Sequence, residues 1–164
     1  TSLPINQIRC LCEGCDRAIE IVHNGNSKVA IAAAKMAIEL KCPHRVILGT
    51  DGPAGSGAQP LGILRMIAML SSLANIPAEL VFCFATGNTA RMRKLNCGLI
   101  DKGYAADFVF LDRAQHTAGR TLLESVQLGD LPGVGMVMID GIVRAGRSRN
   151  TPPATEVPVV VGAH

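Results

Sequence analysis

Residues 45–57 read RVILGTDGPAGSG, an apolar run that stops at an acid and continues into a glycine-rich loop. The run from Val46 to Leu48 is typical of a strand buried on both faces, and Asp51 follows where that strand ends. In α/β sheets and barrels, working residues gather at the carboxyl ends of strands, because loops there vary without disturbing the core. Asp51 is therefore the first candidate catalytic residue. The alternative is a plain turn, which Asp, Gly and Pro also favour.

A second strand and a helix precede this segment. Residues 18–22, AIEIV, predict a short strand, and Asn26 or Ser27 can cap the helix that follows. A strand, a helix and a strand in this order predict two parallel strands joined by a right-handed crossover. His23 and Asn24 would then lie at the same end of the sheet as Asp51.

Further helices follow the glycine-rich loop. Pro60 and Pro77 each suit the first position of a helix, and the patterns that follow them run to about Leu73 and Phe84. We expect residues 86–88 to break the second of these helices. A short basic helix then reaches Asn96.

The pattern changes to short strands and turns after Asn96. Asp140 and Gly141 between two β-rich runs are a strong signal for a type I′ hairpin. The sequence thus predicts an α/β region over 1–96, a small β module over 97–147 and an extended or disordered tail over 148–164. Within the β module, the predicted strands are residues 98–100, 107–112, 134–139 and 142–145, and a helix is predicted over 119–128.

Composition limits the class of protein. Of 164 residues, 48% are hydrophobic, 18% charged and only 3% aromatic, which suits Val-, Leu- and Ala-rich helices packed on a parallel sheet. The net charge of +3 is spread without a cluster, so we expect no nucleic-acid partner. No apolar run approaches the roughly 18 to 20 residues of a membrane span, and no secretion signal begins the sequence. We therefore expect no membrane partner and a cytoplasmic location.

Cysteines and glycines suggest two further kinds of site. Cys10, Cys12 and Cys15 resemble half of a zinc site, but no second Cys or His pair follows at the required spacing. Reduced thiols are the default, and the role of these three stays open. The glycine-rich loop lacks the Lys and the following Ser or Thr of a phosphate-binding P-loop, so it does not indicate a nucleotide site.

Several motifs together resemble a known family. They are the loop D-x-P-x-G-x-G (Asp51, Pro53, Gly55, Gly57), the ATGN of residues 85–88, and GLIDKGYAAD at residues 98–107. This combination resembles the C-terminal part of the amidohydrolase superfamily, and within it the metal-dependent cyclic amide hydrolases of the enamidase type.

The resemblance implies an α/β fold: about the last two strands of a (β/α)8 TIM barrel with their helices, followed by part of a small β-sandwich domain. It places the family's catalytic aspartate, which is also a metal ligand, at Asp51. In that family one or two divalent metals, zinc or iron, activate a water molecule, and the aspartate takes its proton. A cyclic amide would be the substrate, and we assign His23, Asn24, Pro53 and Ser56 to its pocket. The alternative for His23 is a structural or solvent-facing imidazole.

The sequence also departs from the family pattern. The His-x-His of the first barrel strand, the middle-strand ligand and the histidines of strands five and six are missing, and His23, His44, His116 and His164 fit none of these positions. A single carboxylate cannot hold a catalytic metal that needs about three protein ligands. We therefore expect a C-terminal portion that is inactive and binds no metal alone. The alternative is a non-catalytic, self-associating α/β module.

Both hypotheses predict a homo-oligomer. A two-stranded parallel sheet is marginal, and its open edge and uncovered face favour association with neighbouring copies.

Overall fold

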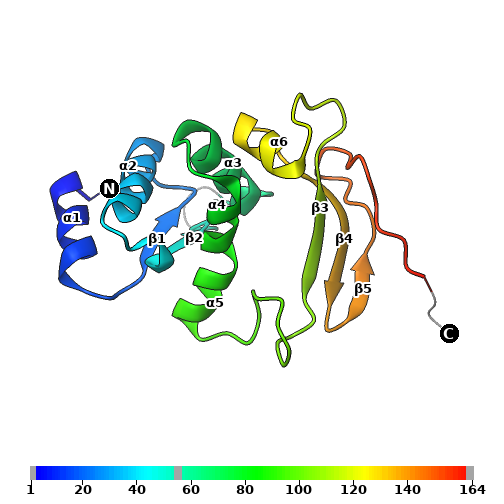
Figure 1. Ribbon diagram of the computed structural model, residues 1–164, viewed down its shortest axis with the longest axis horizontal. Coiled ribbons are helices and arrows are strands. Elements are labelled where there is room, and N and C mark those ends of the chain that lie inside the picture. Colours follow the sequence, from blue (N-terminus) through cyan, green and yellow to red (C-terminus); the bar gives the residue numbers. More distant parts are fainter. Residues whose placement is uncertain (1–2, 54–56, 162–164) are drawn as a thin grey trace.

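The predicted β-α-β unit opens the structure, a computed structural model that describes residues 3–53 and 57–161. Its strands are parallel, with Ile21 opposite Leu48, so the predicted parallel pairing is confirmed. Figure 1 shows the unit at one end of the molecule. Its elements are α1 (Ile5–Gly14), β1 (Ile19–Val22), α2 (Ser27–Glu39), the short 3-10 helix η1 (Pro43–Arg45) and β2 (Val46–Gly49).

Asn26 begins α2, as its sequence predicts. Its side-chain oxygen accepts hydrogen bonds from the backbone N–H groups of Lys28 and Val29 at 3.0 and 3.2 Å. These groups have no partner within the helix, so the cap stabilises its first turn. The buried face of α2 is mainly alanine, which lets the helix lie close to its neighbours; it comprises Ala30, Ala33, Ala34, Met36 and Ala37.

Three helices connect this unit to the second half of the chain: α3 (Gly62–Leu73), α4 (Ala78–Ala85) and α5 (Gly87–Arg93). Pro60 does not begin α3 as predicted, because Leu61 has a left-handed backbone (φ 60°) and delays the start to Gly62. The predicted break is also narrower, since Thr86 alone interrupts the helices (φ −116°, ψ −95°).

The second half is an antiparallel sheet in the order β3-β4-β5, with α6 beside it (Figure 1). Asp140 and Gly141 turn the chain between β4 and β5 with φ values of 53° and 73°. Positive φ at both positions is what a type I′ hairpin requires, so this prediction is confirmed. The elements are β3 (Phe108–Asp112), α6 (Leu122–Leu128), β4 (Gly133–Ile139) and β5 (Ile142–Ala145).

The strand predicted at residues 98–100 is wrong. Gly98 has a φ of 78°, and the chain there forms bends and turns. The backbone N–H of Ala105 donates to the carbonyl oxygen of Asn96 at 3.0 Å, which closes residues 96–105 into a loop. The apolar residues Leu99 and Ile100 do not join the sheet, because local turns provide hydrogen bonds for the backbone of this loop.

The segment from Ser148 to residue 161 is irregular, and it begins against β4, where the backbone N–H of Ser148 donates to the Val134 carbonyl oxygen at 2.9 Å. Ala154 forms an isolated antiparallel bridge with Ala114 and is buried. Gly133 makes this approach possible, because a β-carbon there would lie 2.5 Å from the backbone nitrogen of Ala154. The sequence pattern does not indicate that this segment packs on the sheet.

One hydrophobic core joins the two halves. Phe84, Leu70 and Val81 are fully buried between the parallel strands and α6, which contributes Val126. Gln127 of α6 adds a polar link, since its side-chain nitrogen donates to the Ser71 carbonyl oxygen at 3.2 Å. Among the described residues, no helix combines the length and apolar character needed to cross a membrane.

Candidate active site

The carboxyl ends of β1 and β2 form the candidate site. The parallel register sets Val22 opposite Gly49, and the backbone N–H of His23 continues the ladder to the Gly49 carbonyl oxygen at 3.0 Å. One residue further, the side-chain nitrogen of Asn24 donates to the backbone oxygen of Asp51 at 3.0 Å. The structure thus places Asn24 and Asp51 side by side.

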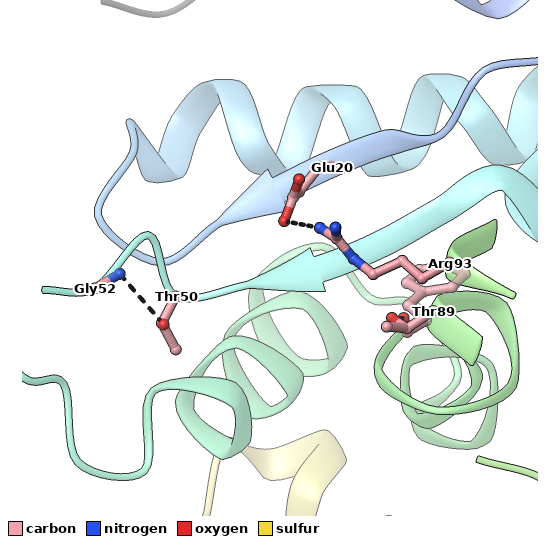
Figure 2. A network of polar contacts seen from close by, with 6 residues as sticks. Glu20, Thr50, Gly52, Thr89 and Arg93 are labelled. Carbon is pink, nitrogen blue, oxygen red and sulfur yellow. Dashed lines mark hydrogen bonds and ion pairs between the residues drawn. The ribbon is translucent and has the colours of Figure 1, made fainter. Parts of the chain in front are cut away.

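The backbone around Asp51 turns sharply away from the strand. Asp51 has a left-handed φ of 56°, and its side chain is exposed. The backbone N–H of Gly52 donates to Thr50 Oγ1 at 3.3 Å, as Figure 2 shows, and the Gly52–Pro53 peptide bond is cis. The exposed carboxylate stands on a short turn, so it can reach a molecule bound beyond the strand ends.

The remaining predicted pocket residues differ in their surroundings. His23 is only partly exposed, and its Nδ1 atom is buried without a hydrogen-bond partner in the part of the chain that is described. Pro53 is exposed next to Asp51. Ser56 lies outside the described residues. Because an unpaired buried nitrogen is costly, His23 has unused hydrogen-bonding capacity at this end of the strand.

An open cavity of about 620 Å³ extends from Asn24 and Asp51 along the length of β1. Its walls come mainly from β1, α1 and α2 and mix apolar side chains with polar ones, which include Glu20 within β1 and Asn24 and Asp51 at its end. A concave, partly apolar surface with a few polar groups is the usual character of a small-molecule site.

Glu20 and Arg93 form an ion pair that the sequence analysis missed. Arg93 Nη2 of α5 lies 2.9 Å from Glu20 Oε1, and Figure 2 shows the two side chains pointing toward each other across the strands. A β-carbon at Gly49 would lie 2.6 Å from the same carboxylate oxygen, so the glycine leaves room for it. The available signal was a single acid inside the apolar run AIEIV.

The described residues do not assemble a metal site. Within residues 3–53 and 57–161, no three His, Cys, Asp or Glu side chains stand close enough together to hold a metal ion. Asp51 contributes one carboxylate, and its neighbours Asn24 and Thr50 are neutral. These side chains alone do not fit a catalytic metal, which needs about three protein ligands.

Comparison with known proteins places the chain in a family. The sequence profile of the Amidohydrolase family matches residues 7–143. The chain belongs to the amidohydrolase family. The family predicted from the loop at Asp51, the ATGN segment and the GLIDKGYAAD segment is therefore confirmed, and amidohydrolases generally use divalent metals.

Sequence relatives include enamidase and several deaminases. The chain is 38% identical to enamidase of Eubacterium barkeri over 154 residues, which cover 94% of this chain and 40% of that amidohydrolase. It is 33% identical to the 5-methylthioadenosine/S-adenosylhomocysteine deaminase of Thermococcus sibiricus over 104 residues, or 58% of this chain and 24% of the deaminase. The chain thus spans about 40% of the length of the enamidase that it resembles.

Solved structures agree with this assignment. The crystal structure of enamidase superposes with a TM-score of 0.93 and 37% identity, covering 96% of this chain and 41% of the enamidase. A β-aspartyl dipeptidase from Fervidobacterium islandicum AW-1 superposes with a TM-score of 0.63 at 19% identity, over 93% of this chain and 39% of the dipeptidase. The second likeness concerns the fold alone, whereas the first confirms the resemblance to the enamidase type.

Proposed function

We propose that this chain is the C-terminal part of an amidohydrolase that hydrolyses a C–N bond of a cyclic amide, as an enamidase-like enzyme. The main support is the enamidase superposition, with a TM-score of 0.93 over 96% of the chain. The pairing of Asn24 with Asp51 at the strand ends supports it independently, because it sets a carboxylate where α/β enzymes carry their catalytic groups.

The proposed architecture is a partial barrel followed by part of a sandwich. In it, β1 and β2 are the last two strands of a (β/α)8 barrel over residues 1–96. The sheet of β3, β4 and β5, over residues 97–147, is part of a small β-sandwich domain, and residues 148–164 form the tail. The short parallel pair supports this view, since two four-residue strands alone give little independent stability.

Asp51 is the proposed proton acceptor and metal ligand. A carboxylate within hydrogen-bond reach of an attacking water can take its proton and pass it to the leaving nitrogen. Its exposed position on a short turn supports this role. His23, Asn24, Pro53 and Ser56 would contact the ring of the substrate. Asn24 also holds the backbone of Asp51, so it would fix the direction of the carboxylate.

Any catalytic metal would need ligands from outside the described residues, since these assemble no group of three. We therefore propose that the chain alone retains no zinc or iron and has no amidase activity. Elemental analysis of the purified chain after dialysis measures this directly. A stoichiometric metal ion that survives dialysis would contradict the proposal.

A chimera tests the proposed function. The region of the Eubacterium barkeri enamidase that matches this chain is replaced by the chain itself, and ring opening is measured with a panel of cyclic amides. Because the two superpose closely, we expect the chimera to fold, to bind metal and to turn over at least one cyclic amide. A folded, metal-loaded chimera without any turnover would contradict the proposal.

The alternative is a non-catalytic module that associates with itself. Exposed apolar side chains favour it, since Ile100 and Val161 are 88% and 90% exposed. This second function would be favoured if the chimera folded but had no activity and the chain alone formed a stable oligomer.

A further inference from the structure

The ion pair of Glu20 with Arg93 joins β1 to α5 outside the hydrophobic core. Ile21 belongs to the core cluster, and successive side chains of a strand point to opposite faces, so Glu20 projects from the other face of β1. Arg93 Nη2, on the last residue of α5, lies 2.9 Å from Glu20 Oε1, and Figure 2 shows the Arg93 side chain reaching across β2. Both side chains are about half exposed, so the pair contributes little to the stability of the fold.

Gly49 leaves room for the carboxylate of this pair. A β-carbon at Gly49 would lie 2.6 Å from Glu20 Oε1, the oxygen that Arg93 holds. Gly49 is the last residue of β2 and does not have a positive φ, so its backbone conformation does not require glycine. Space for the Glu20 carboxylate is therefore the structural reason for a glycine at this position, two residues before Asp51.

Helix α5 holds both strands of the parallel pair at the same end. Near the start of α5, the Asn88 side chain donates to the Val46 carbonyl oxygen of β2 at 3.0 Å. At the end of α5, Arg93 bonds Glu20, which follows Ile19, the residue opposite Val46. The two helix positions are about 7 Å apart along the axis, and neighbouring strands are about 4.8 Å apart. One short helix therefore spans both strands and fixes them relative to each other.

The candidate site at the other end of the strands depends on this register. The Asn24 side chain reaches the Asp51 backbone oxygen at 3.0 Å, and each strand contributes only four paired residues. Strands advance about 3.3 Å per residue, so a displacement of β1 along β2 by about half a residue breaks this hydrogen bond. A contact that holds the two strands in register therefore also holds Asn24 against Asp51.

We propose that Glu20 and Arg93 are positioning residues of the candidate site. Their ion pair holds β1 on β2 in the register that lets the Asn24 side chain bond the Asp51 backbone, and this bond fixes the turn that carries the Asp51 carboxylate. The two side chains act through Asn24 and bind no substrate themselves. The part of this inference that concerns turnover rests on the proposed function, whereas the part that concerns Asn24 does not.

Nuclear magnetic resonance of the ¹⁵N-labelled chain observes the Asn24 side chain directly. Its NH₂ signals are identified by their loss in Asn24→Asp. In Arg93→Met, which keeps the length of the side chain without its charge, we expect the bonded proton to exchange with solvent about 3- to 5-fold faster. Arg93→Lys can still reach Glu20 and should keep the wild-type exchange rate. Arg91→Met, at an exposed position of the same helix, is the matched control.

These variants should all fold, because the ion pair is half exposed, and each Tm should stay within about 2 °C of the wild type. A faster exchange at Asn24 would then report a change of position and not a loss of stability. Unchanged Asn24 exchange in Arg93→Met would overturn the proposal, and so would an equal change in Arg91→Met.

A second pair of variants tests the role of Gly49. Gly49→Ala places a methyl group where the Glu20 carboxylate lies, so we expect the same change in Asn24 exchange as in Arg93→Met. Glu20→Ala removes the carboxylate and therefore the conflict. Adding Gly49→Ala to Glu20→Ala should change the Asn24 exchange rate no further. An equal effect of Gly49→Ala with and without the Glu20 carboxylate would overturn the proposal.

Turnover by the enamidase chimera tests the consequence for the proposed reaction. We expect Arg93→Met to lower kcat per bound metal ion by about 3- to 5-fold with a smaller change in KM, and Arg93→Lys to restore kcat. Unchanged kcat in Arg93→Met would overturn the positioning role and leave the proposed function standing. A parent chimera without turnover would instead overturn the proposed function, and the Asn24 exchange rates would still decide the positioning role.

Discussion

The side-chain nitrogen of Asn88 donates a hydrogen bond to the backbone oxygen of Val46 at 3.0 Å, joining α5 to the first residue of β2. The same nitrogen donates to the Pro43 carbonyl oxygen at 2.9 Å. Asn88 is buried and is the last residue of the ATGN segment that helped to indicate the family. Its amide therefore fixes the base of the strand whose other end carries Asp51.

Replacement of Asn88 by Ala should destabilise the chain. Two carbonyl oxygens, the buried one of Val46 and the partly buried one of Pro43, lose their donor, so we expect the free energy of unfolding to fall by about 2 kcal/mol. Urea unfolding followed by circular dichroism measures the change. Asn96→Ala is the control, because Asn96 makes one exposed bond of 3.4 Å to Gly103, and its cost should stay below about 0.5 kcal/mol. Equal effects of the two variants would show that the Asn88 amide does not hold β2.

Stability should also fall at alkaline pH because of Cys12. The pKa of its thiol is raised from 9.0 to about 11 in the folded chain, so between these values the unfolded chain has already lost a proton that the folded chain keeps. The stabilisation is complete below pH 9 and is lost as the pH rises toward 11. Urea midpoints over this range should decrease more steeply for the wild type than for Cys12→Ala. Parallel curves would contradict the buried, protonated thiol.

The chain should associate with itself at micromolar concentration. The cavity beside β1 exposes apolar atoms next to the strand edge, and its wall includes Leu3 and Leu11, which are 49% and 43% exposed. Neighbouring copies can cover this surface, so light scattering should give a mass of at least two chains. Leu11→Lys should shift the mass toward that of the monomer. A wild-type monomer at that concentration would contradict the expectation of a homo-oligomer.

The sequence predicted the elements that depend on interactions between residues close together in the chain. The order of strand, helix and strand around Asn26 predicted the parallel strands, because a helix cap and an apolar helix face are set by neighbouring residues. The turn at Asp140 and Gly141 was predictable for the same reason, since few residues accept two successive positive φ values.

Features that depend on distant contacts were not predictable in this way. The late start of α3 follows from the left-handed backbone of Leu61, which no periodic pattern indicates. The ion pair of Glu20 with Arg93 joins residues 73 positions apart, and the tail reaches β4 only because Gly133 lacks a side chain. At the candidate site, the predicted strand ends indicated Asp51 and Asn24 as site residues. The hydrogen bond from the Asn24 side chain to the Asp51 backbone oxygen could not be predicted, because it depends on the register of the two parallel strands.

Turnover by the enamidase chimera carrying Asp51→Asn tests the central claim most directly. Asn keeps the size of the side chain but cannot accept a proton, so we expect kcat per bound metal ion to fall by about 100-fold or more. Asp16→Asn, at an exposed position beyond α1, should retain the activity of the parent chimera. If the Asp51→Asn chimera kept full turnover, Asp51 would not be the catalytic carboxylate.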